Sequence, residues 1–366
     1  MNLERFRTVV SAVSDEQSAI KSLSLLVKLI KAVEELTKEV DSPALQKQVT
    51  DILRTLDDGL ARAPSNDFPP AWREVLAELE IEDLVGNGLG RSIDMLAKPV
   101  KVDPDVVGRQ LSTLADRLEV LVDSFDKMQE SFTDLAIGED KPAPGAFELG
   151  FMIPRGEVDE ELGSLGREFV QLNRLLGPFL ELSTGTRDPV RVRSISSSGF
   201  ATLLEVAPST AMMFAVALES LIANYETVLK IRLAERELAG SKLPDETLDA
   251  VSDHGRTLMS REIESLAGKL LASATHIEPE RANELGKELK DSLTALANRI
   301  DRGFVIEVRT GELPPPTEGV SEQDVRAIAE EVLSKQNRLR PPVVSDQPVL
   351  GLPEPPDVED PTTSKE

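Results

Sequence analysis

The sequence has no cysteine among its 366 residues. Disulfide bonds, thiolate metal sites, iron-sulfur clusters and cysteine nucleophiles are therefore excluded. Aromatic residues are also scarce, at 4% of the chain with a single tryptophan and a single tyrosine. The core must then be built from leucine, valine, isoleucine and alanine, a composition that suits packed helices better than stacked sheets.

Basic residues are outnumbered, since 41 Lys and Arg face 65 Asp and Glu for a formal net charge of -24. An acidic chain repels phosphate backbones unless its basic residues cluster, and no such cluster is visible in the sequence. We therefore expect no nucleic-acid partner and no binding to anionic lipid. The opening segment, MNLERFRTVV, carries charges where a signal peptide is apolar, so a cytoplasmic protein is expected.

Motifs for catalysis, cofactors and metals are also missing. The glycines of GNGLGR at 86–91 follow no predicted strand, so a turn is favoured over a nucleotide-binding loop. His254 and His276 stand too far apart for a compact metal site, and no GxSxG or SxxK motif marks a serine nucleophile. The sequence thus predicts no catalytic residue, no cofactor and no metal.

Helical periodicity dominates residues 1–137. Over Val107–Leu135, apolar residues recur at alternating steps of four and three, which places them along one seam of a long helix. A second helix is predicted over 15–40, opened by a capping box at Ser14, and a third over 42–60. These patterns predict an N-terminal helical bundle.

A linker at 138–145 separates this bundle from a different pattern at 146–310. Alternating apolar residues predict strands at 147–153 and 304–308, and a hairpin is predicted over 190–206. The helical stripes of this region cover 162–179, 209–238, 245–274 and 278–300. The predicted fold class is α+β, predominantly α: a helical bundle followed by a domain with a small sheet of about four strands and long helices.

The remaining residues, 311–366, form a proline-rich acidic tail that is predicted to be flexible. A short amphipathic helix is predicted within it, near 321–336. Two interpretations stay open for this helix: a docking element on a flexible tether, or a helix that rests on its own domain or frays in solvent.

The hairpin at 190–206 offers a candidate interaction surface. A four-residue loop pairs Ile195 with Phe200, which turns Val192 and Leu203 toward the core. The opposite face then mixes arginines with apolar side chains, a composition suited to protein contacts.

The stretch at 211–223 is the most apolar in the chain. Its thirteen residues are too few to span a bilayer, so no membrane partner is expected and a buried central helix is predicted. Its methionines could repack against a variable partner. Together with the hairpin, this stretch gives the candidate interaction residues Arg191, Arg193, Phe200, Leu204, Met212, Met213 and Phe214.

Three functional hypotheses follow. The sequence favours a non-enzymatic helical interaction protein, a scaffold or regulator that self-associates as a homo-oligomer or holds a protein partner. The second hypothesis is an enzyme whose carboxylates converge only in three dimensions, around a metal such as Mg²⁺. The third is a bacterial toxin or defence effector that exposes the helix at 211–223 to a membrane on activation.

Overall fold

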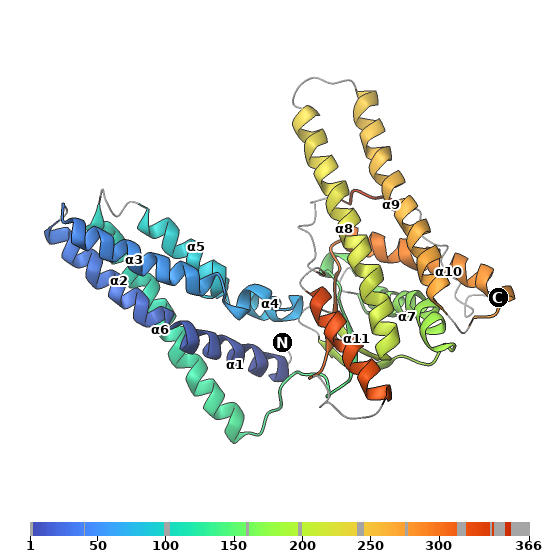
Figure 1. Cartoon of the computed structure of the whole chain (residues 1–366), viewed down its shortest axis with the longest axis horizontal. Coiled ribbons are helices and arrows are strands. Elements are labelled where there is room, and N and C mark those ends of the chain that lie inside the picture. The colour runs from blue at the N-terminus through green and yellow to red at the C-terminus, as the bar shows by residue number, and fades with distance from the viewer. Residues whose placement is uncertain are drawn as a thin grey trace. The chain divides into compact units, whose positions relative to one another are not determined.

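The computed structural model describes residues 3–39, 41–98, 103–158, 161–196, 200–239, 245–274, 277–312, 320–336, 339 and 348–352. The chain divides into two compact units, unit 1 at residues 1–141 and unit 2 at residues 142–366 (Figure 1). The described residues are mostly helical and contain one small antiparallel sheet. The predicted fold class, predominantly α with a four-stranded sheet, is confirmed.

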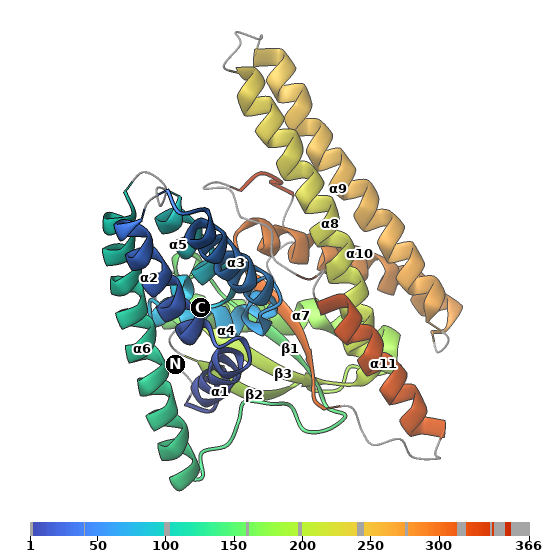
Figure 2. The ribbon, with the colours of Figure 1, turned by 60° about the vertical axis from the view of Figure 1, so that its left-hand side comes forward.

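Unit 1 is a helical bundle. Its longest helix contacts the first two helices and the fifth, and the second helix also packs against the third (Figures 1 and 2). The helices are α1 (Leu3–Ile20), α2 (Ser22–Lys38), α3 (Pro43–Leu60), α4 (Pro70–Glu78), α5 (Gly86–Ala97) and α6 (Pro104–Asp134), with 3-10 turns at Pro64–Asp67 and Glu82–Leu84.

The predicted seam lies on α6. The helix begins where the carboxylate of Asp103 accepts a hydrogen bond from the backbone N–H of Val106 at 3.1 Å. The seam is buried in the core of unit 1 from Val107 to Phe125, which explains the regular spacing of its apolar residues. Leu135 is 71% exposed because it lies beyond the last helical turn.

The helix predicted over 15–40 is wrong in its boundaries. The structure has two helices there, separated at Lys21, whose backbone is left-handed with φ of 58°. Ser14 lies inside α1 and is buried, so it does not cap a helix. The first helix begins earlier than predicted because α1 has an apolar stripe of its own. This stripe consists of Phe6, Val9, Val10 and Val13.

Unit 2 contains the sheet, in the order β2-β3-β1-β4 with every neighbouring pair antiparallel. Alternation along β1 turns Phe147, Leu149 and Phe151 to one face, where they join the core that the helices build. The strands are β1 (Phe147–Met152), β2 (Arg191–Ser196), β3 (Ala201–Val206) and β4 (Val305–Thr310).

The helices of unit 2 surround α8, which contacts four other helices and the strands β1 and β4 (Figure 2). The ring of Phe214 on α8 packs edge-on against Phe151 at 5.9 Å and Phe179 at 5.2 Å between centroids. The prediction of a buried central helix at 211–223 is thus confirmed. The helices are α7 (Leu162–Thr184), α8 (Pro208–Ala239), α9 (Asp245–Ser273), α10 (Pro279–Asp301) and α11 (Val320–Gln336), with a 3-10 turn at Arg155–Glu157.

The apolar part of α8 is longer than the sequence pattern indicated. By length and composition alone, Pro208–Ile231 could cross a membrane, a property that buried core helices share. Within unit 2, the side chains of Leu218 and Leu221 have no exposed surface.

The tail contains two segments that pack on unit 2. The predicted short helix forms as α11, and its Ala329 and Val332 are fully buried against α8 and β4. Residues 348–352 form a second docked segment, in which Leu350 is fully buried. The remaining residues of the tail, 313–319, 337–338, 340–347 and 353–366, lie outside the described residues.

Candidate functional site

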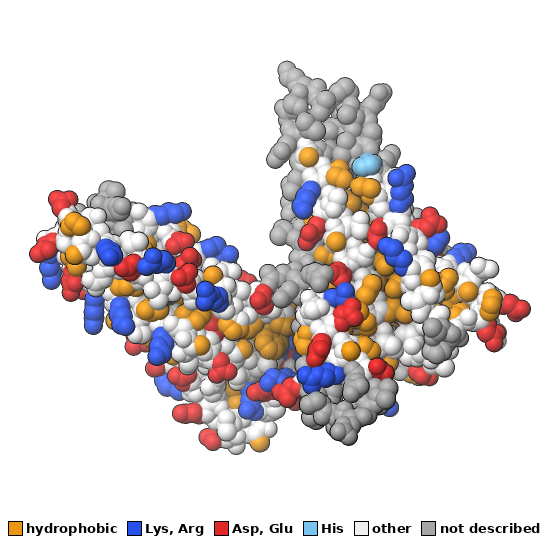
Figure 3. Space-filling model, viewed as in Figure 1, with side chains coloured by type: hydrophobic (Ala, Val, Ile, Leu, Met, Phe, Trp, Pro, Cys, Tyr) orange, Lys and Arg blue, Asp and Glu red, His pale blue; other side chains and the backbone are white. Residues whose placement is uncertain are grey.

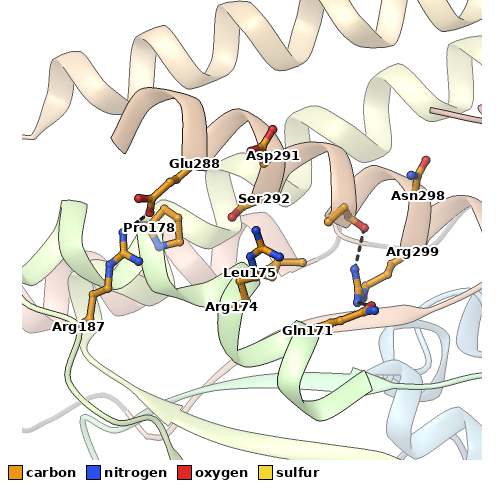
Figure 4. A pocket seen from close by; sticks show the side chains of 11 residues that line it. Gln171, Arg174, Leu175, Pro178, Arg187, Glu288, Asp291, Ser292, Asn298 and Arg299 are labelled. Carbon is orange, nitrogen blue, oxygen red and sulfur yellow. Dashed lines mark hydrogen bonds and ion pairs between the residues drawn. The ribbon is translucent and has the colours of Figure 1, made fainter. Parts of the chain in front are cut away.

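A hollow of about 300 Å³ opens between α7 and α10 (Figure 4). Its walls are mostly polar, because the facing turns of the two helices present arginine, amide and carboxylate side chains rather than leucine. The polar residues that line it are Gln171, Arg174, Arg187, Glu288, Asp291, Ser292, Asn298 and Arg299.

A network of ion pairs closes one end of this hollow. Glu181 receives Arg281 Nε at 2.7 Å and Arg187 Nε at 2.6 Å, and both arginines also contact Glu288. The hydrogen bond from Arg281, supported by Arg187, lowers the pKa of Glu181 from 4.5 to about 2. Glu181 therefore stabilises the fold fully above about pH 4.5, and this contribution is lost as the pH falls toward 2.

The other end of the hollow is closed by Arg299. Its Nε donates to Glu168 at 2.7 Å, one Nη donates to Gln171 at 2.8 Å, and the other reaches the carbonyl of Ala295 at 3.2 Å. The charges of Arg187 and Arg299 are thus matched by carboxylates of the same chain. The hollow can admit a small polar molecule, but these two arginines offer it no uncompensated charge.

The weak metal and nucleotide motifs do not form sites within the described residues. No group of three or more His, Asp or Glu side chains converges there, and His254 is exposed on α9 while His276 lies outside these residues. The glycine-rich segment starts α5, and the backbone N–H of Gly86 donates to the buried carboxylate of Glu16 at 3.0 Å. A carboxylate of the chain itself thus occupies the position that a phosphate would need.

The hairpin differs from its predicted register. The structure pairs Ile195 with Thr202 rather than with Phe200, and a bulge at Arg193 shifts the pairs beyond it, so that Val192 faces Leu204. The error arises at the loop, because the strands close with the pair Ser196 and Ala201 rather than Ile195 and Phe200, and the bulge then offsets one residue of this shift. The predicted pairing of Val192 with Leu203 is therefore wrong.

The three candidate residues on the hairpin lie in different environments. Arg191 is exposed at the sheet edge, whereas Arg193 pairs with the carboxylate of Glu148 at 2.5 Å. Phe200 is half-buried in the loop with φ of 44°, and the guanidinium of Arg155 lies 5.6 Å from its ring centre.

The remaining candidates belong to the core rather than to a surface. Leu204 and Phe214 are buried, and Met212 and Met213 are half-buried where they pack against the same core. Leu204 turns inward because it pairs with Leu149 of β1, which lies on the helix-covered face of the sheet. These four residues therefore offer little area to a partner.

The sheet edge instead exposes two residues that the sequence assigned to the core or left unassigned. Val192 is 56% exposed and Ile195 is 55% exposed, both on β2, one of the two edge strands of the sheet. The alternation of apolar residues marks a strand, but it does not show which strand lies at the edge of the sheet. Val192 and Ile195, which share one face of β2, form what we call the edge patch, and Arg191 lies beside it on the opposite face of the sheet.

A second site was invisible in the sequence. The carboxylate of Asp301, at the end of α10, accepts the backbone N–H of Val349 at 2.8 Å and that of Leu350 at 2.7 Å. The hydroxyl of Tyr225 on α8 donates to the same carboxylate at 2.9 Å. Asp301 therefore holds the chain's own segment 348–352 through its backbone, and Tyr225 holds Asp301.

Charged side chains of both signs are interspersed over the described part of the face drawn in Figure 3.

Comparison with known proteins finds no matching family model, no matching curated protein and no matching solved structure.

Proposed function

We propose that the protein is a non-enzymatic interaction protein that self-associates through the edge patch. The observation that carries the proposal is the exposure of two β-branched residues, Val192 and Ile195, on one face of the edge strand β2. Exposed apolar side chains on a sheet edge are a recognised site of association between chains.

The available free energy is modest. Each half-exposed Val or Ile side chain contributes about 1 kcal/mol when it is buried. Two copies bury four such side chains, or roughly 4 kcal/mol, against the loss of rotational and translational freedom. A gain of roughly 4 kcal/mol corresponds to a dissociation constant of about 1 mM, so we expect a weak dimer in the millimolar range.

The charges around the patch support a second copy of this chain as the partner. Arg191 lies directly opposite Glu205 of β3, and both side chains are exposed. In a two-fold dimer each contact is repeated, so Arg191 of one copy can face Glu205 of the other twice. The bulge at Arg193 interrupts the outer backbone of β2, which favours side-chain contact over continuous strand pairing.

The proposal predicts that the double substitution Val192→Lys with Ile195→Lys abolishes self-association. Two lysines replace the apolar contact with charges that repel their copies across a two-fold axis. Sedimentation equilibrium of the full chain should show a mass that rises with concentration for the wild type, and about tenfold weaker association or none for the variant.

Val170→Lys is the matched control, because Val170 is an equally apolar residue, 69% exposed on α7. It should associate as the wild type does. Equal association of the wild type and the double variant would contradict the proposal, as would a wild type that stays monomeric at every concentration.

A further inference from the structure

Residues 348–352 pack on unit 2, and side chains from α9 and α10 bind their backbone. Besides the two N–H groups bound by Asp301, Arg256 Nε on α9 donates to the carbonyl of Leu350 at 3.0 Å. The amide of Asn298 on α10 donates to the carbonyl of Leu352 at 3.1 Å. Two backbone N–H groups and two backbone carbonyls of the segment are thus bound by side chains, as they are for a peptide bound in a recognition groove.

The segment also has an apolar anchor. Leu350 is fully buried, and Val349 and Leu352 are buried on either side of it, all within the core of unit 2. Gly351 has φ of 52°, a left-handed conformation that glycine adopts readily and other residues adopt at a cost. The groove therefore selects a sequence, apolar-apolar-glycine-apolar, in addition to a backbone.

Asp301 is the central group of this groove. Asp301 is only 2% exposed, and its hydrogen-bond partners among the described residues are two backbone N–H groups of the segment and the hydroxyl of Tyr225. A buried carboxylate needs such hydrogen bonds to remain charged. Two of the three come from the docked segment, so Asp301 is built to receive a peptide backbone.

We propose that Tyr225, Arg256, Asn298 and Asp301 form a peptide-binding site whose resident ligand is the chain's own Val349–Leu352 segment, and which accepts the same sequence from a separate molecule. The segment lies between Pro348 and Pro353. Proline lacks an N–H and cannot extend a helix or a central strand, so it keeps such a segment available for exchange. This site is distinct from the edge patch and does not depend on it.

The test uses the full chain with Leu350→Asp, which removes the anchor and frees the groove, and a fluorescent peptide of the sequence SDQPVLGLPEP. Fluorescence anisotropy should show binding to this variant. The wild type should bind the peptide at least about tenfold more weakly, because a tethered ligand competes at an effective concentration near the millimolar range. A peptide with the same Leu350→Asp change should not bind.

Two further substitutions in the Leu350→Asp chain locate the site. Asp301→Asn should weaken peptide binding by about tenfold, because the amide nitrogen cannot accept an N–H. Asp291→Asn, on the same helix, is the matched control and should bind as its parent does. No binding to a folded Leu350→Asp chain, or equal loss in both variants, would overturn the proposal.

Hydrogen exchange keeps the proposal testable if Leu350→Asp does not fold. The milder Leu350→Ala chain then replaces it, with the same peptide and the same expectations. In the wild type, the amides of Val349 and Leu350 should be protected, and excess peptide added to the Leu350→Ala chain should restore the protection of the groove. Unprotected amides in the wild type, or no restoration, would overturn the proposal.

Discussion

At the residue scale, the groove around Asp301 shows what one buried carboxylate can organise. It brings together a hydroxyl from α8 and two backbone groups that lie 48 and 49 residues further along the chain. Nothing in the sequence near Asp301 distinguishes it from the other acidic residues of this chain. Its role depends on contacts that only the folded chain creates, so sequence patterns could not have identified it.

Tyr225 provides a direct probe of this groove. Burial raises the pKa of its hydroxyl, and the charge of Asp301 and the hydrogen bond to it raise the pKa further. The folded state therefore favours the neutral phenol. Its contribution to stability is complete below the unfolded pKa of about 10 and is lost as the pH rises beyond it.

We predict that the single tyrosine stays protonated in the folded chain at about pH 11, well above the ordinary pKa of this side chain. Near-ultraviolet absorbance measures the phenolate directly, and the same chain unfolded in guanidinium is the control, with a midpoint near about pH 10. A midpoint near that value in the folded chain would show that Tyr225 is not buried against Asp301.

At the scale of elements, the predictions succeeded where an amphipathic stripe ran unbroken. The seam of α6, the central helix α8 and all four strands were predicted because burial imposes a period on the sequence. The break at Lys21 and the bulge at Arg193 were missed because each depends on one residue in an unusual backbone conformation or register. The edge position of β2, and with it the edge patch, was missed because strand order is set by long-range pairing.

The position of α11 distinguishes the two interpretations of the tail helix, a free docking element and a helix that rests on its own domain. The structure places it against its own unit, with Val332 fully buried and Lys335 Nζ 2.9 Å from the carboxylate of Glu219 on α8. It therefore contributes to the core of unit 2, and the free docking element is not the state that the structure shows.

We predict that Val332→Asp lowers the free energy of unfolding of unit 2 by roughly 3 kcal/mol, because it buries an unpaired carboxylate. Leu333→Asp is the control: this neighbour is 40% exposed, and its substitution should cost under about 1 kcal/mol. Urea unfolding separates the two units, since Tyr225 reports on unit 2 and Trp72 reports on unit 1. Similar effects of the two substitutions would mean that α11 does not dock as described.

At the scale of the whole molecule, net charge opposes self-association. Two copies that each carry a formal charge of -24 repel one another at long range. The exposed contacts between Arg191 and Glu205 are worth at most about 1 kcal/mol each. Screening by salt should therefore weaken the repulsion between two copies more than the attraction. We predict that the dimer strengthens as the ionic strength rises from about 0.01 M to about 0.15 M. Over this range the Debye length falls from about 30 Å to about 8 Å.

The most direct measurement is sedimentation equilibrium of the unmodified full chain at these two ionic strengths over a range of concentrations. Self-association through the edge patch predicts a mass that rises from that of the monomer toward twice that value, at lower protein concentration in the higher salt. A monomeric mass at every concentration and both ionic strengths would contradict the proposed function.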